Sequence, residues 1–296
     1  MKFVNDFATG SKVIRERLPA LAGSQLVGDD SGWDNYAIIA DNKYLFRFPR
    51  RIDSLTQIKQ ETEVLAQLYA KLPNDIEVPK YLATDLDGDY PFVYYEMIQG
   101  QPLTRELYAG FDAEQKERFK RQLVGFLRIL HSINPESCKS LTHVDPRQKY
   151  QELYQRITQS CFKYLSPIEQ DKTQRLFADY FQDYVMCNYE PVVVHGDLSE
   201  NHILITERGI GIIDFGDTCV FDPAIDLSWF YLFDRELFYG LMKQYLERDD
   251  ADFEKRIVDF YVPIIPYDGV MFGEETQNQI LFTEELNDLK ENLAKL

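Results

Sequence analysis

The spacing of hydrophobic and polar positions changes character near residue 100. Before that point, strand-like segments at residues 35–40 and 44–48 flank the turn Asp41-Asn42, as in an antiparallel hairpin. From Asp112 onward, apolar residues recur with the periodicity of helices. The pattern therefore predicts an N-terminal part built on strands and a C-terminal part built mostly of helices.

Further elements complete the N-terminal part. An amphipathic helix is expected over residues 5–21. A second helix is expected over residues 54–72, with Ser54 as its N-cap. Two more strands are expected at residues 81–84 and 92–97, on either side of a turn. These segments predict an antiparallel sheet with one helix.

The C-terminal part is interrupted by two short apolar runs. Helices are expected over residues 112–132, 148–162 and 167–188, and again from residue 223. The runs at 192–194 and 203–205 read as strands. The chemistry of the chain is concentrated around these two strands.

The segment at residues 192–216, VVVHGDLSENHILITERGIGIIDFG, is the most informative in the chain. Asp197 of an H-x-D triplet stands 17 residues before Asp214 of a D-F-G, with a predicted hairpin between them. Phosphoryl transfer needs one carboxylate to orient a hydroxyl and another to hold metal on the nucleotide phosphates. The segment therefore predicts the catalytic centre of a kinase-like phosphotransferase.

This motif and the pattern of elements together indicate the fold. A small β-rich lobe at residues 1–98, a hinge near residue 98 and a mostly helical lobe at residues 99–296 form the layout of the protein-kinase-like fold. The expected fold class is therefore α+β.

Asp197 is the predicted catalytic carboxylate, and Asp214 is the predicted Mg²⁺ ligand. The kinase signature places Asn five residues after the catalytic Asp. Here His202 holds that position, with Asn201 one residue earlier. An imidazole nitrogen can replace the amide oxygen, although it is a softer donor than Mg²⁺ favours. On register, His202 is predicted as the second ligand ahead of Asn201.

The phosphoryl donor is expected to bind the N-terminal lobe. Residues 28–32 lack a full G-x-G-x-x-G and can be an ordinary turn, or can fold over phosphates with Ser31 as a donor. Where V-A-I-K has its lysine, this chain has Arg47, which can grip phosphate. Glu61 in the following helix is the predicted partner of Arg47, and Glu63 is the alternative.

The hinge strand is expected to bind the base of the nucleotide. Backbone groups from Glu96 to Ile98 are predicted to pair with a purine edge. Tyr95 is bulky for the position beside the base pocket and would disfavour adenine in the usual pose. GTP therefore stands beside ATP as a candidate donor.

Charge adds information about the ligands. The chain of 296 residues carries 49 acidic and 32 basic residues, a net charge of −17. Such a chain repels nucleic acid and anionic membranes and attracts cationic ligands, although surplus carboxylates can simply aid solubility. Four scattered cysteines, no signal peptide and no apolar run that spans a bilayer favour a cytoplasmic protein. Nothing demands more than a monomer.

The motifs together resemble the aminoglycoside phosphotransferase family, and especially its 2″-phosphorylating branch. The resemblance covers nearly the whole chain and is carried by Arg-Phe-Pro at 47–49, Leu-His-Ser-Ile at 130–133, HGDLSENHILI, IDFGD and Asp222-Pro-Ala-Ile-Asp226-Leu. It implies transfer of the γ-phosphoryl group of ATP or GTP, with Mg²⁺, to a hydroxyl of a polyamino sugar.

The resemblance also implies an acidic acceptor site in the helical lobe. Asp217, next to the D-F-G, is the first candidate for gripping an ammonium group. Asp268 matches the position of an acidic substrate ligand in 2″-type relatives. Glu274 and Glu236 are further candidates, and a solvated surface position is the alternative for both.

Two other functions stay open. One is a metabolic small-molecule kinase of the same superfamily, acting on choline, homoserine or an amino sugar, because these enzymes share the fold and catalytic motif. The other is a pseudokinase that binds nucleotide without turnover, supported only by Arg47 and His202 at positions where kinases carry Lys and Asn.

Overall fold

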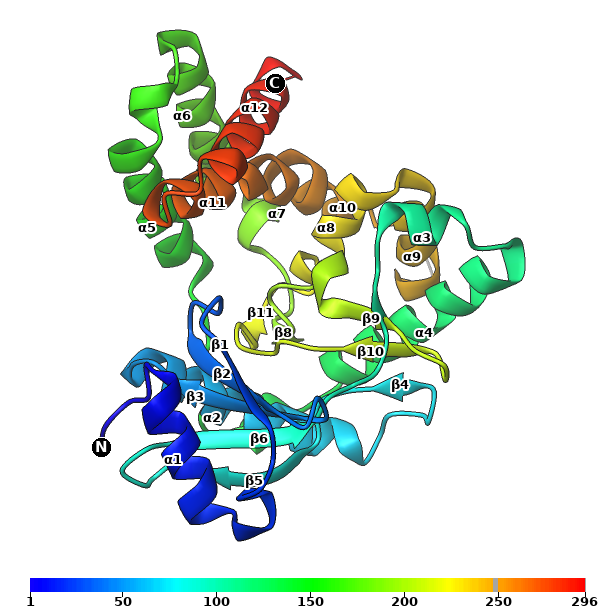
Figure 1. The fold of residues 1–296 in the computed structure, drawn as a ribbon. Coiled ribbons are helices and arrows are strands. Elements are labelled where there is room, and N and C mark those ends of the chain that lie inside the picture. Colours follow the sequence, from blue (N-terminus) through cyan, green and yellow to red (C-terminus); the bar gives the residue numbers. More distant parts are fainter. Residues whose placement is uncertain (247–249, 296) are drawn as a thin grey trace. The chain divides into compact units, whose positions relative to one another are not determined.

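The computed structural model of the protein describes residues 1–246 and 250–295, which pack as two compact units (Figure 1). The first, the sheet unit, contains Met1–Thr142 and His195–Cys219. The second, the helical unit, contains His143–Val194 and the chain from Val220 onward. These units do not follow the lobes 1–98 and 99–296, which remain a prediction about where the chain hinges.

The sheet unit is built on the predicted antiparallel sheet. Its five strands lie in the order β1-β2-β3-β6-β5. The strands are β1 Leu26–Asp29, β2 Asn35–Ala40, β3 Tyr44–Pro49, β5 Tyr81–Asp85 and β6 Phe92–Glu96. Every pairing in this sheet is antiparallel, so the expectation for this part of the chain is confirmed.

Helix α1 packs on one face of this sheet and is shorter than predicted. It runs over Phe7–Arg17 because Asp6 caps it, accepting from the backbone N–H of Thr9 at 2.8 Å. Pro19 then starts a separate 3₁₀ turn, Pro19–Leu21. The apolar side of α1 shares a buried cluster with strand residues such as Phe46 and Phe48.

Helix α2, Ile52–Tyr69, is the second helix of the sheet unit. Side chains alternate between the two faces of a strand, so Arg47, between Phe46 and Phe48, points to the opposite face from α1. The prediction that Ser54 caps α2 was wrong. Arg51 is the N-cap residue, and Ser54 lies inside the first turn, where its buried hydroxyl donates to Asp34 Oδ1 at 3.3 Å.

A second, smaller sheet contains the hairpin predicted between Asp197 and Asp214. Its order is β4-β10-β9-β7, and β9 and β10 form the predicted antiparallel hairpin. The strands are β4 Ile76–Glu77, β7 Gln101–Pro102, β9 Ile203–Ile205 and β10 Ile210–Ile212. Two helices of the same unit follow β7, α3 Arg105–Ala109 and α4 Ala113–His131. Helix α4 begins in a capping box made by Asp112 and Gln115.

The helical unit contains most of the remaining helices. They are α5 Pro146–Ser160, α6 Pro167–Gln182, α7 Tyr184–Cys187, α8 Ile225–Phe233, α9 Arg235–Leu246, α10 Ala251–Arg256, a π-helical segment Ile257–Tyr261, α11 Val262–Glu275 and α12 Gln279–Lys295. The predicted helix at 167–188 is broken in two, because Asp183 leaves the helical conformation and caps α7. Strands β8 Val192–Val194 and β11 Cys219–Phe221 pair with each other.

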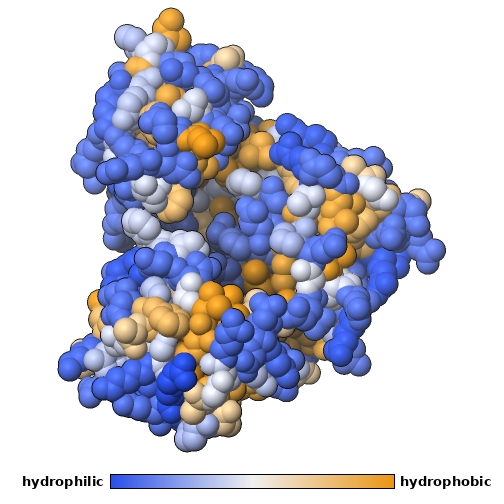
Figure 2. Space-filling model, in the orientation of Figure 1, coloured by the Kyte–Doolittle hydropathy of each residue, from blue (hydrophilic) through white to orange (hydrophobic). Residues whose placement is uncertain are grey.

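The surface agrees with the composition of the chain. Most of the face shown in Figure 2 is hydrophilic, as expected from 49 acidic and 32 basic residues. Across residues 1–246 and 250–295, no helix has the length and apolar character needed to cross a membrane.

Candidate active site

The β9–β10 hairpin and the loops at its ends place Asp197, the predicted catalytic carboxylate, and Asp214, the predicted metal ligand, on either side of one histidine. His202 lies in the 3₁₀ turn Glu200–His202 that leads into β9. Its Nδ1 is 3.6 Å from Asp197 Oδ2, and its Nε2 is 3.7 Å from Asp214 Oδ2. The structure therefore brings together the three residues to which the sequence assigned proton and metal chemistry.

The main chain determines which nitrogen of His202 carries hydrogen. Nδ1 lies 2.6 Å from the backbone carbonyl oxygen of Asp197. Because a carbonyl oxygen only accepts, Nδ1 is the donor, and the lone pair of the neutral ring lies on Nε2, which faces Asp214. Asn201, the alternative candidate, is exposed. The geometry agrees with the choice of His202 on register.

The backbone of the catalytic loop adopts two uncommon conformations. Gly196 has φ +87°, and a Cβ atom there would overlap the backbone carbonyl oxygen of Asp217. Asp214 has φ 64°, in the left-handed region that Asp tolerates better than most residues. Buried His195 braces this loop, because its Nε2 donates to the carbonyl oxygen of Ile213 at 3.0 Å. The requirement for glycine at 196 was missed at the sequence level, although the H-G-D triplet contains it.

Arg47 and Glu61 form a buried ion pair. Arg47 Nη1 lies 2.8 Å from both carboxylate oxygens of Glu61, and Arg47 Nη2 lies 3.6 Å from Asp214 Oδ1. Burial raises the pKa of the Glu61 carboxyl and Arg47 opposes that rise. Glu63 instead accepts from the backbone N–H and hydroxyl of Ser140, both at 2.9 Å. Of the two carboxylates, Glu61 is therefore the partner of Arg47.

A cavity of about 360 Å³ in the sheet unit joins these groups to the loop between β1 and β2. Ser31, Arg47, Asp197, Asp214 and Asp217 all line it. The Ser31 hydroxyl and backbone N–H both donate to Asp29 Oδ1, at 2.6 and 2.9 Å, so the predicted phosphate donor is already bound within its own loop. The cavity thus contains the predicted catalytic residue together with Ser31, Arg47 and Asp214.

The three predicted base-binding residues are not equivalent in the structure. Tyr95 is buried and lines the cavity. Glu96 and Ile98 are absent from the described lining. The Glu96 side chain reaches Lys43 Nζ at 3.5 Å, and the intervening Met97 donates its N–H to the carbonyl oxygen of Lys43 at 2.8 Å. Tyr95 therefore has a direct place in the site, whereas base contacts by Glu96 and Ile98 stay a prediction.

The acceptor candidates are divided between the two units. Asp217 lies in the sheet unit and lines the cavity with Asp197. Asp268 and Glu236 are exposed in the helical unit. Glu274 pairs with Lys163 and accepts from the Tyr164 hydroxyl at 2.7 Å, and these hydrogen bonds lower the pKa of its carboxyl. Glu274 is thus already bound within its own unit.

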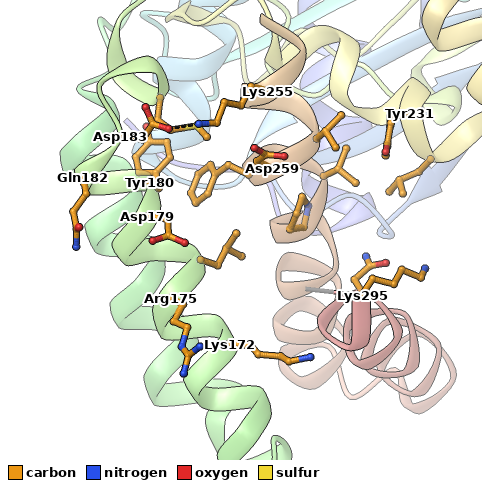
Figure 3. A pocket seen from close by; sticks show the side chains of 18 of the residues that line it. Lys172, Arg175, Asp179, Tyr180, Gln182, Asp183, Tyr231, Lys255, Asp259 and Lys295 are labelled. Atoms are coloured by element: carbon orange, nitrogen blue, oxygen red, sulfur yellow. Dashed lines mark hydrogen bonds and ion pairs between the residues drawn. The ribbon is translucent and has the colours of Figure 1, made fainter. Parts of the chain in front are cut away.

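The helical unit has a larger cavity of about 980 Å³ (Figure 3). Lys172, Arg175 and Asp179 reach it from α6, and Lys295 from α12. Its described lining includes none of the three acceptor candidates of this unit, Asp268, Glu274 and Glu236. Size alone therefore does not identify the acceptor site.

The fold and the site together define a class of protein. The chain belongs to the phosphotransferase enzyme family, because a model of that family matches residues 25–261 of the chain. The matched region contains the sheet, the β9–β10 hairpin, Asp197, Asp214 and Asp217.

Solved structures narrow the comparison. The GDP and kanamycin complex of APH(2")-IIia is 26% identical with a TM-score of 0.84, covering 98% of this chain and 99% of that one. The GDP complex of wild-type aminoglycoside 2'-phosphotransferase-IIIa is 25% identical with a TM-score of 0.83, covering 97% and 98%. A macrolide 2'-phosphotransferase type I is 22% identical with a TM-score of 0.70, covering 98% and 99%, and shows the fold alone. The predicted α+β, protein-kinase-like fold is confirmed.

Proposed function

We propose that this protein transfers the γ-phosphoryl group of ATP or GTP to a hydroxyl of an aminoglycoside, in the manner of the 2″-type enzymes. The observation that carries the proposal is the placement of Asp197 and Asp214 on either side of His202, at 3.6 and 3.7 Å. Family membership and the likeness to an aminoglycoside enzyme at 26% identity support it.

Asp197 is the proposed catalytic residue. It lies exposed in the cavity next to Asp214, where an acceptor hydroxyl can reach it. Its carboxylate would orient that hydroxyl and take its proton as the bond to phosphorus forms. The bracing of this loop by His195 keeps the carboxylate in place and reduces the reorganisation needed at each turnover.

The residues around Asp214 fit a divalent cation. A metal-binding histidine usually donates its other ring N–H to a carbonyl or carboxylate, and His202 does so through Nδ1. No group of three or more His, Cys, Asp or Glu in the described residues can hold a metal. Two protein ligands, Asp214 and His202, suit Mg²⁺ that takes its other ligands from phosphate and water. The metal would neutralise charge on the transferring phosphoryl group.

Arg47 is proposed to bind the phosphates of the donor. Glu61 engages Nη1, so Nη2 on the side of Asp214 stays available to phosphate oxygens. Ser31 and the backbone of its loop would cover the phosphates from the other wall of the cavity. Tyr95, with backbone groups of Glu96 and Ile98, would bind the base. Because the Tyr95 side chain is large and would disfavour adenine, GTP is a candidate donor as well as ATP.

The acceptor is proposed to be a polycation. Asp217 shares the cavity with Asp197, and a net charge of −17 would draw a cationic substrate toward the chain. Asp268 is proposed as a second acidic contact, with Glu236 as a weaker candidate. Glu274 is not proposed, because Lys163 and Tyr164 already bind its carboxylate. Two acidic contacts suit a multiply charged amino sugar, whereas a single quaternary ammonium group calls for an aromatic cage.

A substrate panel tests the proposal. Turnover of ATP and GTP with Mg²⁺ is measured against kanamycin, gentamicin, choline, homoserine and simple amino sugars, and NMR of the product locates the new phosphate ester. Turnover with the aminoglycosides alone, and phosphate on the 2″ oxygen, is the expected result.

The other outcomes separate the alternatives. Activity only with choline, homoserine or a simple amino sugar would retain the catalytic site and assign the protein to a metabolic kinase. Nucleotide binding without turnover on any acceptor would indicate a pseudokinase. Both results would contradict the aminoglycoside proposal.

A further inference from the structure

Two tyrosines from neighbouring strands lie on the same face of the sheet as Arg47, because Tyr95 is paired with Leu45 and Tyr81 with Tyr95. Tyr81 of β5 and Tyr95 of β6 are paired in register, with ring centroids 5.6 Å apart. Tyr95 has a place in the proposed donor site because it lines the cavity. The proposed function gives Tyr81 no role, and nothing in the sequence distinguished it from an ordinary strand residue.

Glu61 needs more hydrogen-bond donors than Arg47 supplies. Its side chain is completely buried, and an ionised carboxylate offers about four lone-pair sites. Arg47 Nη1 approaches both oxygens at 2.8 Å, as one donor atom shared between two acceptors. A buried carboxylate stays ionised and in one orientation only when a cation and further donors satisfy it.

The Tyr81 hydroxyl is the group placed to supply another donor. Its oxygen is buried, and among the described residues none forms a hydrogen bond of standard geometry with it. Burial, followed by the negative charge of Glu61, raises the pKa of Tyr81 well above its usual range. The hydroxyl therefore keeps its proton and can act only as a neutral donor. Glu61 is the negatively charged group that can accept a hydrogen bond from it.

The start of β5 holds Tyr81 in this position. The backbone N–H of Tyr81 donates to the Tyr69 hydroxyl at 3.2 Å, and that hydroxyl donates to the carbonyl oxygen of Pro79. Tyr69 belongs to α2, the helix that also carries Glu61. The same helix thus fixes both Glu61 and the strand that presents Tyr81.

We propose that Tyr81 is a positioning residue for the phosphoryl donor, acting through Glu61 on Arg47. Its hydroxyl donates to Glu61, which fixes Arg47 Nη1 and with it the direction of Nη2. The guanidinium is planar and its nitrogens form a rigid fork, so a tilt of Glu61 moves Nη2 away from Asp214 and the phosphates. This inference rests on the proposed function only in that Arg47 contacts the donor.

The test is Tyr81→Phe, which removes the hydroxyl and keeps the ring. Calorimetry measures the Kd of a non-hydrolysable nucleotide with Mg²⁺, and kinetics give KM for donor and acceptor separately. The donor Kd and KM are expected to rise about five- to tenfold, the loss typical of one intramolecular hydrogen bond. The acceptor KM is expected to stay within about twofold.

Two further variants make the result specific. Tyr94→Phe is the matched control, because Tyr94 is on the neighbouring strand and its ring stacks on Phe46 at 4.7 Å, away from the ion pair. It should leave the donor Kd unchanged. In a Glu61→Ala background, which has no acceptor left for the hydroxyl, Tyr81→Phe should change the donor Kd by less than about twofold.

The proposal is overturned if Tyr81→Phe leaves the donor Kd within twofold of wild type, or weakens binding equally in the Glu61→Ala background. Thermal unfolding of each variant identifies a general loss of structure, which would move the donor and acceptor KM together and also count against it. Since the Kd needs no acceptor, the result is independent of whether an aminoglycoside is the substrate.

Discussion

Among the residues that the structure describes, each compact unit buries an arginine–carboxylate pair. The two pairs differ in how many of their donors and acceptors are already hydrogen-bonded. In the helical unit, Arg256 donates to Asp222 through Nε at 2.6 Å and Nη2 at 3.3 Å, and through Nη1 to the carbonyl oxygen of Asp252 at 3.2 Å. Asp222 also accepts from the Tyr261 hydroxyl at 2.7 Å and the Ala224 N–H at 3.0 Å. That pair is saturated.

The pair in the sheet unit is not saturated. Arg47 uses Nη1 for Glu61, and its Nη2 approaches Asp214 only at 3.6 Å, beside a cavity. Both carboxylates are fully buried, so burial does not distinguish the two pairs. The comparison shows that burial does not decide whether a ligand can bind to an ion pair. What matters is whether the pair has a donor, such as Arg47 Nη2, that is not fully hydrogen-bonded and faces a cavity.

The largest expected effect comes from breaking the saturated pair. Asp222→Ala leaves Arg256 buried without its carboxylate, and a broken buried pair costs about 3–5 kcal/mol of stability. Denaturant unfolding measures this loss. An Asp222→Ala protein that unfolds within about 1 kcal/mol of wild type would show that the pair contributes little, because the typical single-site loss is already that large.

A crossed pair of conservative changes sharpens the comparison. Arg47→Lys keeps one donor for Glu61 and loses the second, so the donor KM should rise about tenfold while stability changes little. Arg256→Lys loses the two parallel hydrogen bonds that the guanidinium donates to Asp222. Stability should therefore fall by about 2 kcal/mol, with the donor KM unchanged. For each variant, kinetics give the donor KM and denaturant unfolding gives the free energy of unfolding. Equal effects of the two variants on the donor KM would erase the distinction.

The smallest expected effect concerns an exposed pair, Glu274 with Lys163. Glu274→Gln should change stability by less than about 1 kcal/mol, as for most exposed pairs, and should leave the acceptor KM unchanged. Since hydrogen bonds lower the pKa of Glu274, its small contribution is present above the ordinary carboxyl pKa and lost as pH falls through the lowered value. A large rise in acceptor KM would instead restore Glu274 as a substrate contact.

The sequence predicted most of what is local in the fold and the site. The hairpin, the antiparallel sheet and the spacing from Asp197 to Asp214 follow from short-range patterns. The pairing of Arg47 with Glu61 followed from the kinase motif and from the place of Glu61 in the first half of the next helix. The tautomer of His202 depends on the backbone carbonyl of Asp197, and the need for glycine at 196 depends on that of Asp217. A pattern of side chains does not encode where these carbonyls lie.

What the sequence did not predict depends on contacts between distant segments. Ser54 looked like a helix cap, but Asp34, twenty residues earlier, accepts its hydroxyl. Glu274 looked like a free carboxylate, but Lys163 and Tyr164 lie 111 and 110 positions away. The role proposed for Tyr81 depends on the sheet, whose register places Tyr81 on the face that carries Arg47. Such pairings are set by tertiary packing, which overrides local preference.

The central claim, that Asp197 is the catalytic carboxylate of a phosphotransferase, is tested most directly by Asp197→Asn. Turnover of ATP or GTP with kanamycin is compared with wild type, and calorimetry measures the Kd of the Mg²⁺-nucleotide. We predict a fall in kcat of about 10²- to 10⁴-fold, with the nucleotide Kd unchanged. A variant that keeps kcat within tenfold of wild type, at equal nucleotide binding, would contradict the account.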